Sequence, residues 1–143
     1  DYDSIVRVHK YRLKILEKGK WYLTDVKGQL VSGGYDGVFG YSGGAFRVKN
    51  NDLFGYLNIK GKEVIPVQYK AADDFFRGRA IMSYDDSIGV INPKNERVIS
   101  NSVSIKRLSV NSFVVKKKGK FGVLDYDGVG KLAFNFDSIY SMC

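Results

Sequence analysis

Residues suited to covalent chemistry are scarce in this 143-residue sequence. It holds one histidine, His9, and one cysteine, Cys143. A Cys–His nucleophile pair would have to join these two residues, and a Cys/His zinc site needs about four such ligands. A single cysteine also excludes a disulfide within the chain. We therefore expect no metal site, no cofactor and no disulfide framework.

Carboxylate pairs and a glycine cluster are the other candidates for catalysis. The pairs are Asp73–Asp74 and Asp85–Asp86, and neighbours on a strand point to opposite faces, which makes a poor acid–base dyad. The six glycines between residues 33 and 44 open a Tyr-, Phe- and Ser-rich segment and are not followed by Gly-Lys-Ser/Thr, so we expect a connector and not a phosphate loop. A Ser–His–Asp site would depend on His9, in a basic stretch. The sequence predicts no catalytic site and no enzyme.

Basic residues give the strongest hint of a binding surface. The formal net charge is +8, and Lys and Arg gather near the start, before residue 121 and at recurring turns. The residues in question are Arg7, His9, Lys10, Arg12, Lys14, Lys27, Lys60, Lys62, Lys94, Lys116, Lys117, Lys118 and Lys120. If the turns align on one edge they form a basic stripe, with Tyr22, Tyr56 and Tyr126 available to stack on bases or sugars. The alternative interpretation is a solvated edge whose lysines guard exposed strands.

A repeat of 33–34 residues sets the elements that position these groups. Aromatic or apolar anchors recur at 33-, 34- and 33-residue intervals, each followed four residues later by Asp or Asn. The anchors are Trp21, Phe54, Ile88 and Phe121. A second set stands fourteen or fifteen residues after the anchors: Tyr35, Tyr69, Val103 and Phe136. We expect both sets to stack between neighbouring repeats as core.

Each repeat is expected to fold as three short strands. The anchor strand ends at an Asp or Asn that initiates a turn, and Gly28, Gly61, Asn95 and Gly128 stand where a hairpin needs a positive φ. A second strand follows, which Pro66 ends in one repeat. A link of about ten residues leads to the third strand. Residues 69–76 are the one place where a helical turn is expected.

The whole chain, 1–143, is expected to be a single all-β repeat domain. It opens with a partial repeat (1–18), and further repeats start near residues 19, 52, 86 and 119, the last incomplete. Two arrangements fit these tandem hairpins: an open solenoid-like array, or a closed four-unit, propeller-like ring in which the two ends pair. No apolar run reaches about 18 residues, so no membrane span is expected.

The residues of the second repeat resemble the WG (KWG) repeat family. The matching positions are Phe54, Gly55, Asn58, Gly61, Lys62, Pro66, Tyr69, Phe75, Phe76, Gly78 and Ala80. Elsewhere the resemblance is looser: Tyr22 follows Trp21 in place of Gly, and Ile88 replaces the aromatic. The resemblance implies a β-rich repeat array, mostly found in bacterial proteins, with no general activity and no catalytic residues.

These observations predict a non-catalytic repeat scaffold. We expect it to bind a macromolecular partner, a protein, through an extended β surface. The alternative is binding of nucleic acid, anionic polysaccharide or cell-wall glycan by the basic stripe. Residues 20–28 also resemble a single choline- or glucan-binding cell-wall repeat, but those recur at roughly 20 residues and the chain has one Trp. The sequence assigns no binding residue, compartment or oligomeric state.

Overall fold

The protein is built from four antiparallel sheets. The computed structural model describes residues 2–136, which contain strands and turns and no helix. Sheet one comprises β1 (Ser4–His9), β2 (Arg12–Glu17) and β3 (Lys20–Thr24). Sheet two comprises β4 (Gly37–Ser42), β5 (Ala45–Asn50), β6 (Leu53–Leu57) and β7 (Glu63–Tyr69). Sheet three comprises β8 (Ala71–Ala72), β9 (Ala80–Tyr84), β10 (Ser87–Ile91) and β11 (Arg97–Ser102). Sheet four comprises β12 (Ser104–Ser109), β13 (Ser112–Lys117), β14 (Lys120–Asp125) and β15 (Gly130–Phe136).

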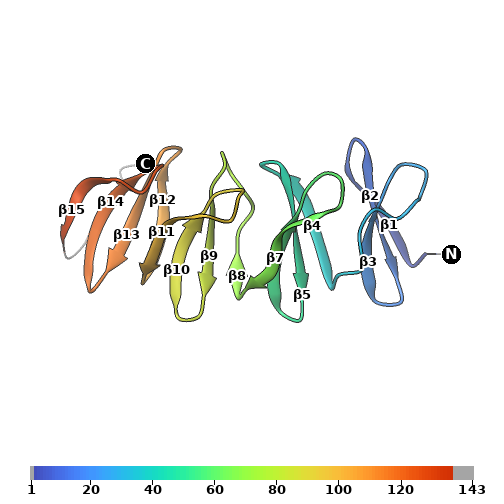
Figure 1. Ribbon diagram of the computed structural model, residues 1–143, viewed down its shortest axis with the longest axis horizontal. Coiled ribbons are helices and arrows are strands. Elements are labelled where there is room, and N and C mark those ends of the chain that lie inside the picture. Colours follow the sequence, from blue (N-terminus) through green and yellow to red (C-terminus); the bar gives the residue numbers. More distant parts are fainter. Residues whose placement is uncertain (1, 137–143) are drawn as a thin grey trace.

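The four sheets stand side by side in an open row. Each is a meander in which successive strands pair, and sheet one and sheet four occupy opposite ends of the row (Figure 1). The all-β prediction is therefore confirmed. Of the two predicted arrangements, the structure takes the open array: β1 and β2 are far from β14 and β15, which a closed ring would bring together (Figure 1).

The prediction of three strands per repeat was one strand short. The link between the second and third predicted strands is itself partly a strand, β1, β4 or β12 in sheets one, two and four. The glycine-rich segment contains β4 and then a tight turn at Gly43 and Gly44, both with positive φ. Each sheet thus joins the second half of one sequence repeat to the first half of the next.

Turn chemistry follows the sequence closely. Gly28, Gly61, Asn95 and Gly128 have φ values of 90°, 83°, 65° and 81°. The backbone N–H of each donates a hydrogen bond to the carbonyl of the Asp or Asn that opens the turn, three residues earlier. The side chain of that Asp or Asn accepts two further backbone N–H groups, as Asp25 does from Lys27 and Gln29 at 2.8 and 2.9 Å. These Asx turns hold the end of every anchor strand in the same geometry.

Two local predictions were wrong. Pro66 does not end its strand: β7 continues to Tyr69, and the register shifts between the pairs Tyr56–Ile65 and Phe54–Tyr69. A bulge is where a residue without a ladder N–H is tolerated. The predicted helical turn over residues 69–76 is replaced by the two-residue strand β8 and an irregular segment.

Three apolar clusters join the sheets in pairs. Phe46, Val48 and Leu57 of sheet two are fully buried against Leu23 of sheet one. The other junctions are built alike, around Tyr56, Ile65, Met82 and Ile91 between sheets two and three, and around Val90, Ile99, Phe113 and Val115 between sheets three and four. Burial of each such side chain stabilises the array by about 1.5–3 kcal/mol. Neighbouring sheets therefore cover one another's apolar faces.

The anchor set and the second set of the repeat differ in how deeply their side chains are buried. Tyr35 and Tyr69 are buried core residues, whereas Val103 is 60% exposed, and the side chain of Phe136 lies outside the described part of the chain. The anchors are half-buried at the rims of the clusters. They are Trp21, Phe54, Ile88 and Phe121. Three of these four carry a cation over the ring, and Ile88 cannot.

Candidate functional site

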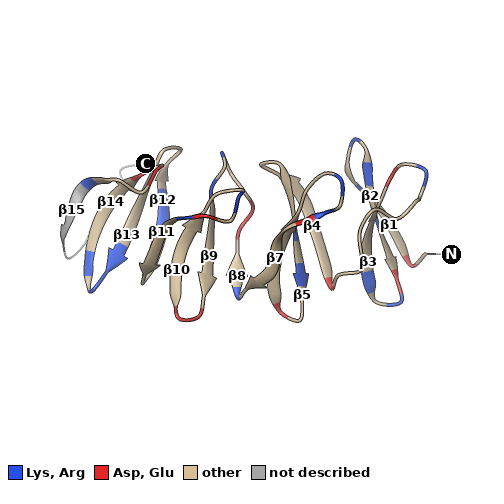
Figure 2. Cartoon of the chain, in the orientation of Figure 1, with Lys and Arg blue, Asp and Glu red and all other residues tan. Residues whose placement is uncertain are grey.

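The four Asx turns lie along one edge of the row. Because every sheet is a meander of the same direction, the turns at 25–28, 58–61, 92–95 and 125–128 fall on the same side. We call this the Asx-turn edge. The exposed charged side chains on it include Lys27, Lys60, Lys62, Glu63, Lys94, Glu96 and Asp127. The predicted stripe thus forms at the level of the backbone, but acidic residues interrupt it and sheet four contributes Asp127 where the others have lysine (Figure 2).

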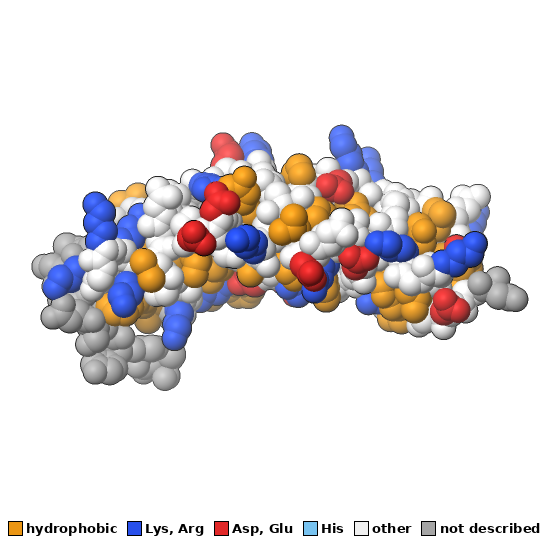
Figure 3. Space-filling view, turned by 90° about the horizontal axis from the view of Figure 1, so that it is seen from below, with side chains coloured by type: hydrophobic (Ala, Val, Ile, Leu, Met, Phe, Trp, Pro, Cys, Tyr) orange, Lys and Arg blue, Asp and Glu red, His pale blue; other side chains and the backbone are white. Residues whose placement is uncertain are grey.

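The opposite edge is basic at the two end sheets and acidic at the two middle sheets. Its hairpin turns lie between β2 and β3, β5 and β6, β9 and β10, and β13 and β14. They carry Lys18 in sheet one, Asp52 in sheet two, Asp85 and Asp86 in sheet three, and Lys118 in sheet four. Figure 2 shows this order of blue, red, red and blue, and the face seen in Figure 3 mixes both colours with apolar side chains. No face drawn is uniformly basic.

The three tyrosines proposed as stacking platforms are engaged elsewhere. Tyr56 is 0% exposed, and its hydroxyl donates to the carbonyl of Asp73 at 2.6 Å. The ring of Tyr126 is covered by the guanidinium of Arg79, 3.7 Å from the ring centroid, and its hydroxyl donates to the carbonyl of Arg77. Tyr22 is half-buried and lies against Gly34. The sequence reading missed this because a tyrosine can bury its ring and still satisfy its hydroxyl.

The basic cluster near the start is largely used to join sheets. Arg12 donates from Nε to the carbonyl of Ile59 at 2.7 Å, across the junction between sheets one and two. Lys14 donates to the carbonyl of Val38 at 2.7 Å and lies over the ring of Trp21, and burial lowers its pKa.

His9 was expected to be exposed, but it is half-buried. Its ring packs at 4.8 Å from that of Tyr41, and its Nδ1 accepts the backbone N–H of Tyr11. Cys143, its one possible thiol partner, lies outside the described residues.

Asp73 and Asp74 act separately. Asp73 accepts the N–H of Ile81 at 2.7 Å, and burial raises the pKa of its carboxyl group. Asp74 accepts a hydrogen bond from Arg47 at 3.1 Å. Within residues 2–136 no cluster of three or more metal-ligating side chains forms, and no helix there is long and apolar enough to span a membrane.

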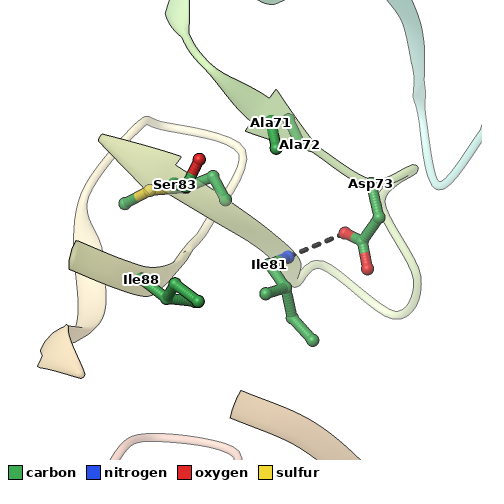
Figure 4. Close-up of a pocket in the computed structure, with 7 residues that line it drawn as sticks. Ala71, Ala72, Asp73, Ile81, Ser83 and Ile88 are labelled. Carbon is green, nitrogen blue, oxygen red and sulfur yellow. Dashed lines mark hydrogen bonds between the residues drawn. The ribbon is translucent and has the colours of Figure 1, made fainter. Parts of the chain in front are cut away.

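Two hollows lie at the junction of sheets three and four or beside it. One, of about 450 Å³, is lined by Arg77, Asn111 and Tyr126 near the Asx-turn edge. The other, of about 320 Å³, is lined by β8, β9 and the start of β10, and is mainly apolar (Figure 4). Its one ionisable group is Asp73. The sequence reading assigned no function to either hollow, although Ile88 in place of an aromatic anchor was a visible signal for the second.

Comparison with known proteins agrees with this architecture. Residues 54–86 match the family described as WG containing repeat. This segment is similar to a WG repeat. It begins at the anchor Phe54 and ends at Asp86, so it spans β6–β9 and crosses the junction between sheets two and three. The predicted resemblance is confirmed at these residues. No curated protein matches the sequence.

Solved structures of similar fold include propeller-like Hsv2 proteins. The array resembles KlHsv2 with loop 6CD replaced by a Gly-Ser linker, at a TM-score of 0.54 and 14% identity, covering 92% of this chain and 52% of that one. For Kluyveromyces lactis Hsv2 with complete loop 6CD, the TM-score is 0.52 and the identity 15%, over 91% of this chain and 49% of that one. The chain therefore spans about half the length of these structures. At such identity the likeness is one of fold.

Proposed function

We propose that this protein is a non-catalytic WG-repeat scaffold that binds a protein partner through its Asx-turn edge. The observation that supports this most is the mixed charge of that edge, where Lys60 and Lys62 stand beside Glu63, and Lys94 beside Glu96. Alternating charges on a regular backbone frame complement a protein surface better than a uniformly anionic polymer. Because the four turns have one geometry, each holds its exposed side chains in the same orientation along the row.

Polar tethers across the junctions support a rigid platform. Tyr35 of the chain's first repeat donates to the carboxylate of Glu63 at 2.7 Å, and Tyr69 donates to Asn95 in the equivalent place one sheet further on. Arg79 repeats the contact of Arg12, donating to the carbonyl of Tyr126 at 2.9 Å. A surface held in this way loses little conformational freedom on binding, which favours affinity.

Site-specific photo-crosslinking tests the proposed edge. Benzoylphenylalanine introduced at Lys60 is expected to cross-link a protein in cells that produce this chain, and the same group at Asp86, an exposed turn residue on the opposite edge, is the matched control. Equal labelling from both positions, or labelling of nucleic acid alone, would contradict the proposal.

Binding of an anionic polymer is the second candidate, favoured by Lys27, Lys60, Lys62 and Lys94 on one edge. If these four neutralise phosphates of a single-stranded 20-mer oligonucleotide, the log–log slope of affinity against salt should be about −3. Heparin serves as the glycan probe. A partner protein whose binding survives moderate salt, together with a flat response of both polymers, favours the first candidate.

A further inference from the structure

Sheets one and two share a cation–aromatic unit at equivalent positions of their strands. In sheet one, the Lys14 ammonium lies 4.6 Å from the ring centroid of Trp21 and donates to the carbonyl of Val38 in the next sheet. The ring belongs to sheet one and the carbonyl to sheet two, so the ammonium group of Lys14 joins the two sheets. The unit is therefore part of the junction as well as of the surface.

Sheet two repeats the unit one register further along. The Arg47 guanidinium lies 4.4 and 5.4 Å from the ring centroids of Phe39 and Phe54, and it donates to the carbonyl of Ala72 in sheet three at 2.8 Å. The spacing of 33 residues from Lys14 to Arg47, and from Trp21 to Phe54, shows that these are the same positions.

Sheet three departs from the unit at all three positions. Thirty-four residues after Phe39, Arg47 and Phe54 stand Asp73, Ile81 and Ile88. Neither a cation nor an aromatic ring is present, and the 320 Å³ pocket opens there. In Figure 4 Asp73, Ile81 and Ile88 lie around the pocket, and the two alanines of β8 line it with methyl groups alone.

Ser83 adds to the space. It is paired with Ile88 across β9 and β10, where sheets two and four pair Lys49 with Phe54 and Lys116 with Phe121. Both lysines lie over the rings of their partners, at 5.7 and 5.3 Å. The pocket therefore results from smaller side chains at positions that the other sheets fill.

The carboxylate of Asp73 gives the pocket its polarity. One oxygen accepts the N–H of Ile81, which fixes the side chain, and the other is 3.9 Å from the guanidinium of Arg107. Arg107 is itself held by the carbonyl of Arg79 at 2.7 Å. Asp74 and Arg47, the other charged groups near Asp73, pair with each other. The second oxygen of Asp73 therefore keeps capacity to accept a hydrogen bond.

We propose that this pocket binds an arylalkylammonium ion, a cation that supplies both the ring and the charge missing from sheet three. The ring lies against Ile81 and Ile88, and the ammonium group donates to Asp73. The cavity is at the lower limit of small-ligand pockets, which suits a single ring. A negatively charged ligand would be repelled by this carboxylate, and Arg107, the cation that pairs with it, does not line the pocket.

The probe is phenethylammonium, titrated into the full chain and followed by amide NMR shifts. We expect saturable shifts at Ala72, Ile81 and Ser83 with a dissociation constant of about 1 mM, as the size of the ligand allows. Two matched probes separate its parts: 3-phenylpropionate reverses the charge, and butylammonium lacks the ring. Each should bind at least about tenfold more weakly. Equal binding of 3-phenylpropionate would overturn the proposal.

Variants of the pocket provide the second test. Ile88→Phe restores the aromatic anchor of the other sheets and fills the space, so it should remove the shifts while the thermal midpoint holds or rises. Ser83→Lys places a cation in the same space and should also weaken binding. It keeps the site testable should Ile88→Phe fail to fold. Asp73→Asn keeps an oxygen for the N–H of Ile81 and should abolish the preference for phenethylammonium over 3-phenylpropionate.

The matched control is Val110→Phe, which adds a ring at a turn residue that is 47% exposed and outside the pocket. It should bind phenethylammonium like the unmodified chain. Unchanged affinity in both Ile88→Phe and Ser83→Lys would place the ligand elsewhere and refute the site. Since the Asx-turn edge does not line this pocket, such a result would leave the proposed scaffold function untouched.

Discussion

At the scale of single residues, the same turn position meets different surroundings in different sheets. Gly28 and Gly61 both have strongly positive φ values, 90° and 83°. A Cβ on Gly28 would touch nothing within 4 Å, whereas one on Gly61 would overlap with the carbonyl group of Val31 in the preceding unit. Glycine is therefore required at position 61 for two reasons: its own positive φ, and the close approach of the Val31 carbonyl.

Alanine substitution separates the two requirements. Gly28→Ala should cost about 1 kcal/mol of unfolding free energy, from the left-handed backbone alone. Gly61→Ala should cost about 2 kcal/mol more, because the turn must move away from Val31. Urea unfolding of both variants measures the difference. Equal losses would show that the turn is not packed against the preceding sheet.

Buried phenols predict the response of the protein to alkali. Burial is the main cause that raises the pKa of Tyr35, Tyr56 and Tyr69 above the usual value of 10.0, and the carboxylate of Glu63 adds to it at Tyr35. Unfolded phenols ionise near pH 10 and folded ones do not, so this stabilisation is complete below pH 10 and is lost as the pH rises further.

Tyr56→Phe tests this at one residue. The variant should lose about 1 kcal/mol near neutral pH, because the hydrogen bond to the carbonyl of Asp73 is removed. It should then lose less than the unmodified chain between about pH 10 and 11.5, since one phenol no longer ionises on unfolding. Urea unfolding across that range gives both values, and an unchanged pH slope would contradict the argument.

At the scale of elements, the sequence predicted what local chemistry determines. The Asx turns were found because an Asp or Asn followed three residues later by Gly or Asn specifies them without reference to the rest of the chain. The strand β4 was missed because Gly37 and Gly40 resemble turn residues, and its pairing with β5 is a tertiary preference. The short β8 was also missed, because its two alanines carry no periodic pattern.

The candidate site was harder to predict for the same reason. Arg12 and Lys14 appear in the sequence as part of a basic surface, but the structure uses both to bridge sheets. Charge alone does not distinguish a residue that binds a partner from one that binds the next repeat. The position of Ile88 in the repeat is the signal that the pocket leaves in the sequence.

The contact of Arg79 with Tyr126, which we call the clasp between sheets three and four, gives a prediction at the scale of elements. The side chain of Arg79 is 11% exposed, donates to Tyr126 across the junction, and covers its ring. Arg79→Ala should cost about 2 kcal/mol, since a charge-assisted bond and a buried stem are both lost. Hydrogen exchange should quicken in the β14–β15 turn first. Arg77→Ala, at an exposed neighbour, is the control, and an equal effect of the two would argue against a specific clasp.

At the scale of the whole molecule, the row is quasi-one-dimensional. Each sheet packs on its immediate neighbours, so stability is the sum of sheets and junctions, and within residues 2–136 no long-range closure holds the end sheets together. The propeller-like structures that share its fold are about twice as long. Four sheets side by side therefore form an elongated particle, with an edge long enough to contact a partner at several turns.

Small-angle X-ray scattering checks this shape directly. A compact globule of 143 residues would have a radius of gyration of about 14.5 Å. The open row separates sheet one from sheet four along its longest axis (Figure 1), so the measured radius should clearly exceed that of the compact globule, and the pair-distance distribution should have an extended tail.

A disulfide between cysteines placed at Ile5 and Val123 should not form without distortion, because these residues belong to opposite ends of the row. A compact scattering profile with ready formation of that disulfide would mean that the chain closes on itself in solution, and the extended edge that we propose as the binding surface would no longer exist in the form described.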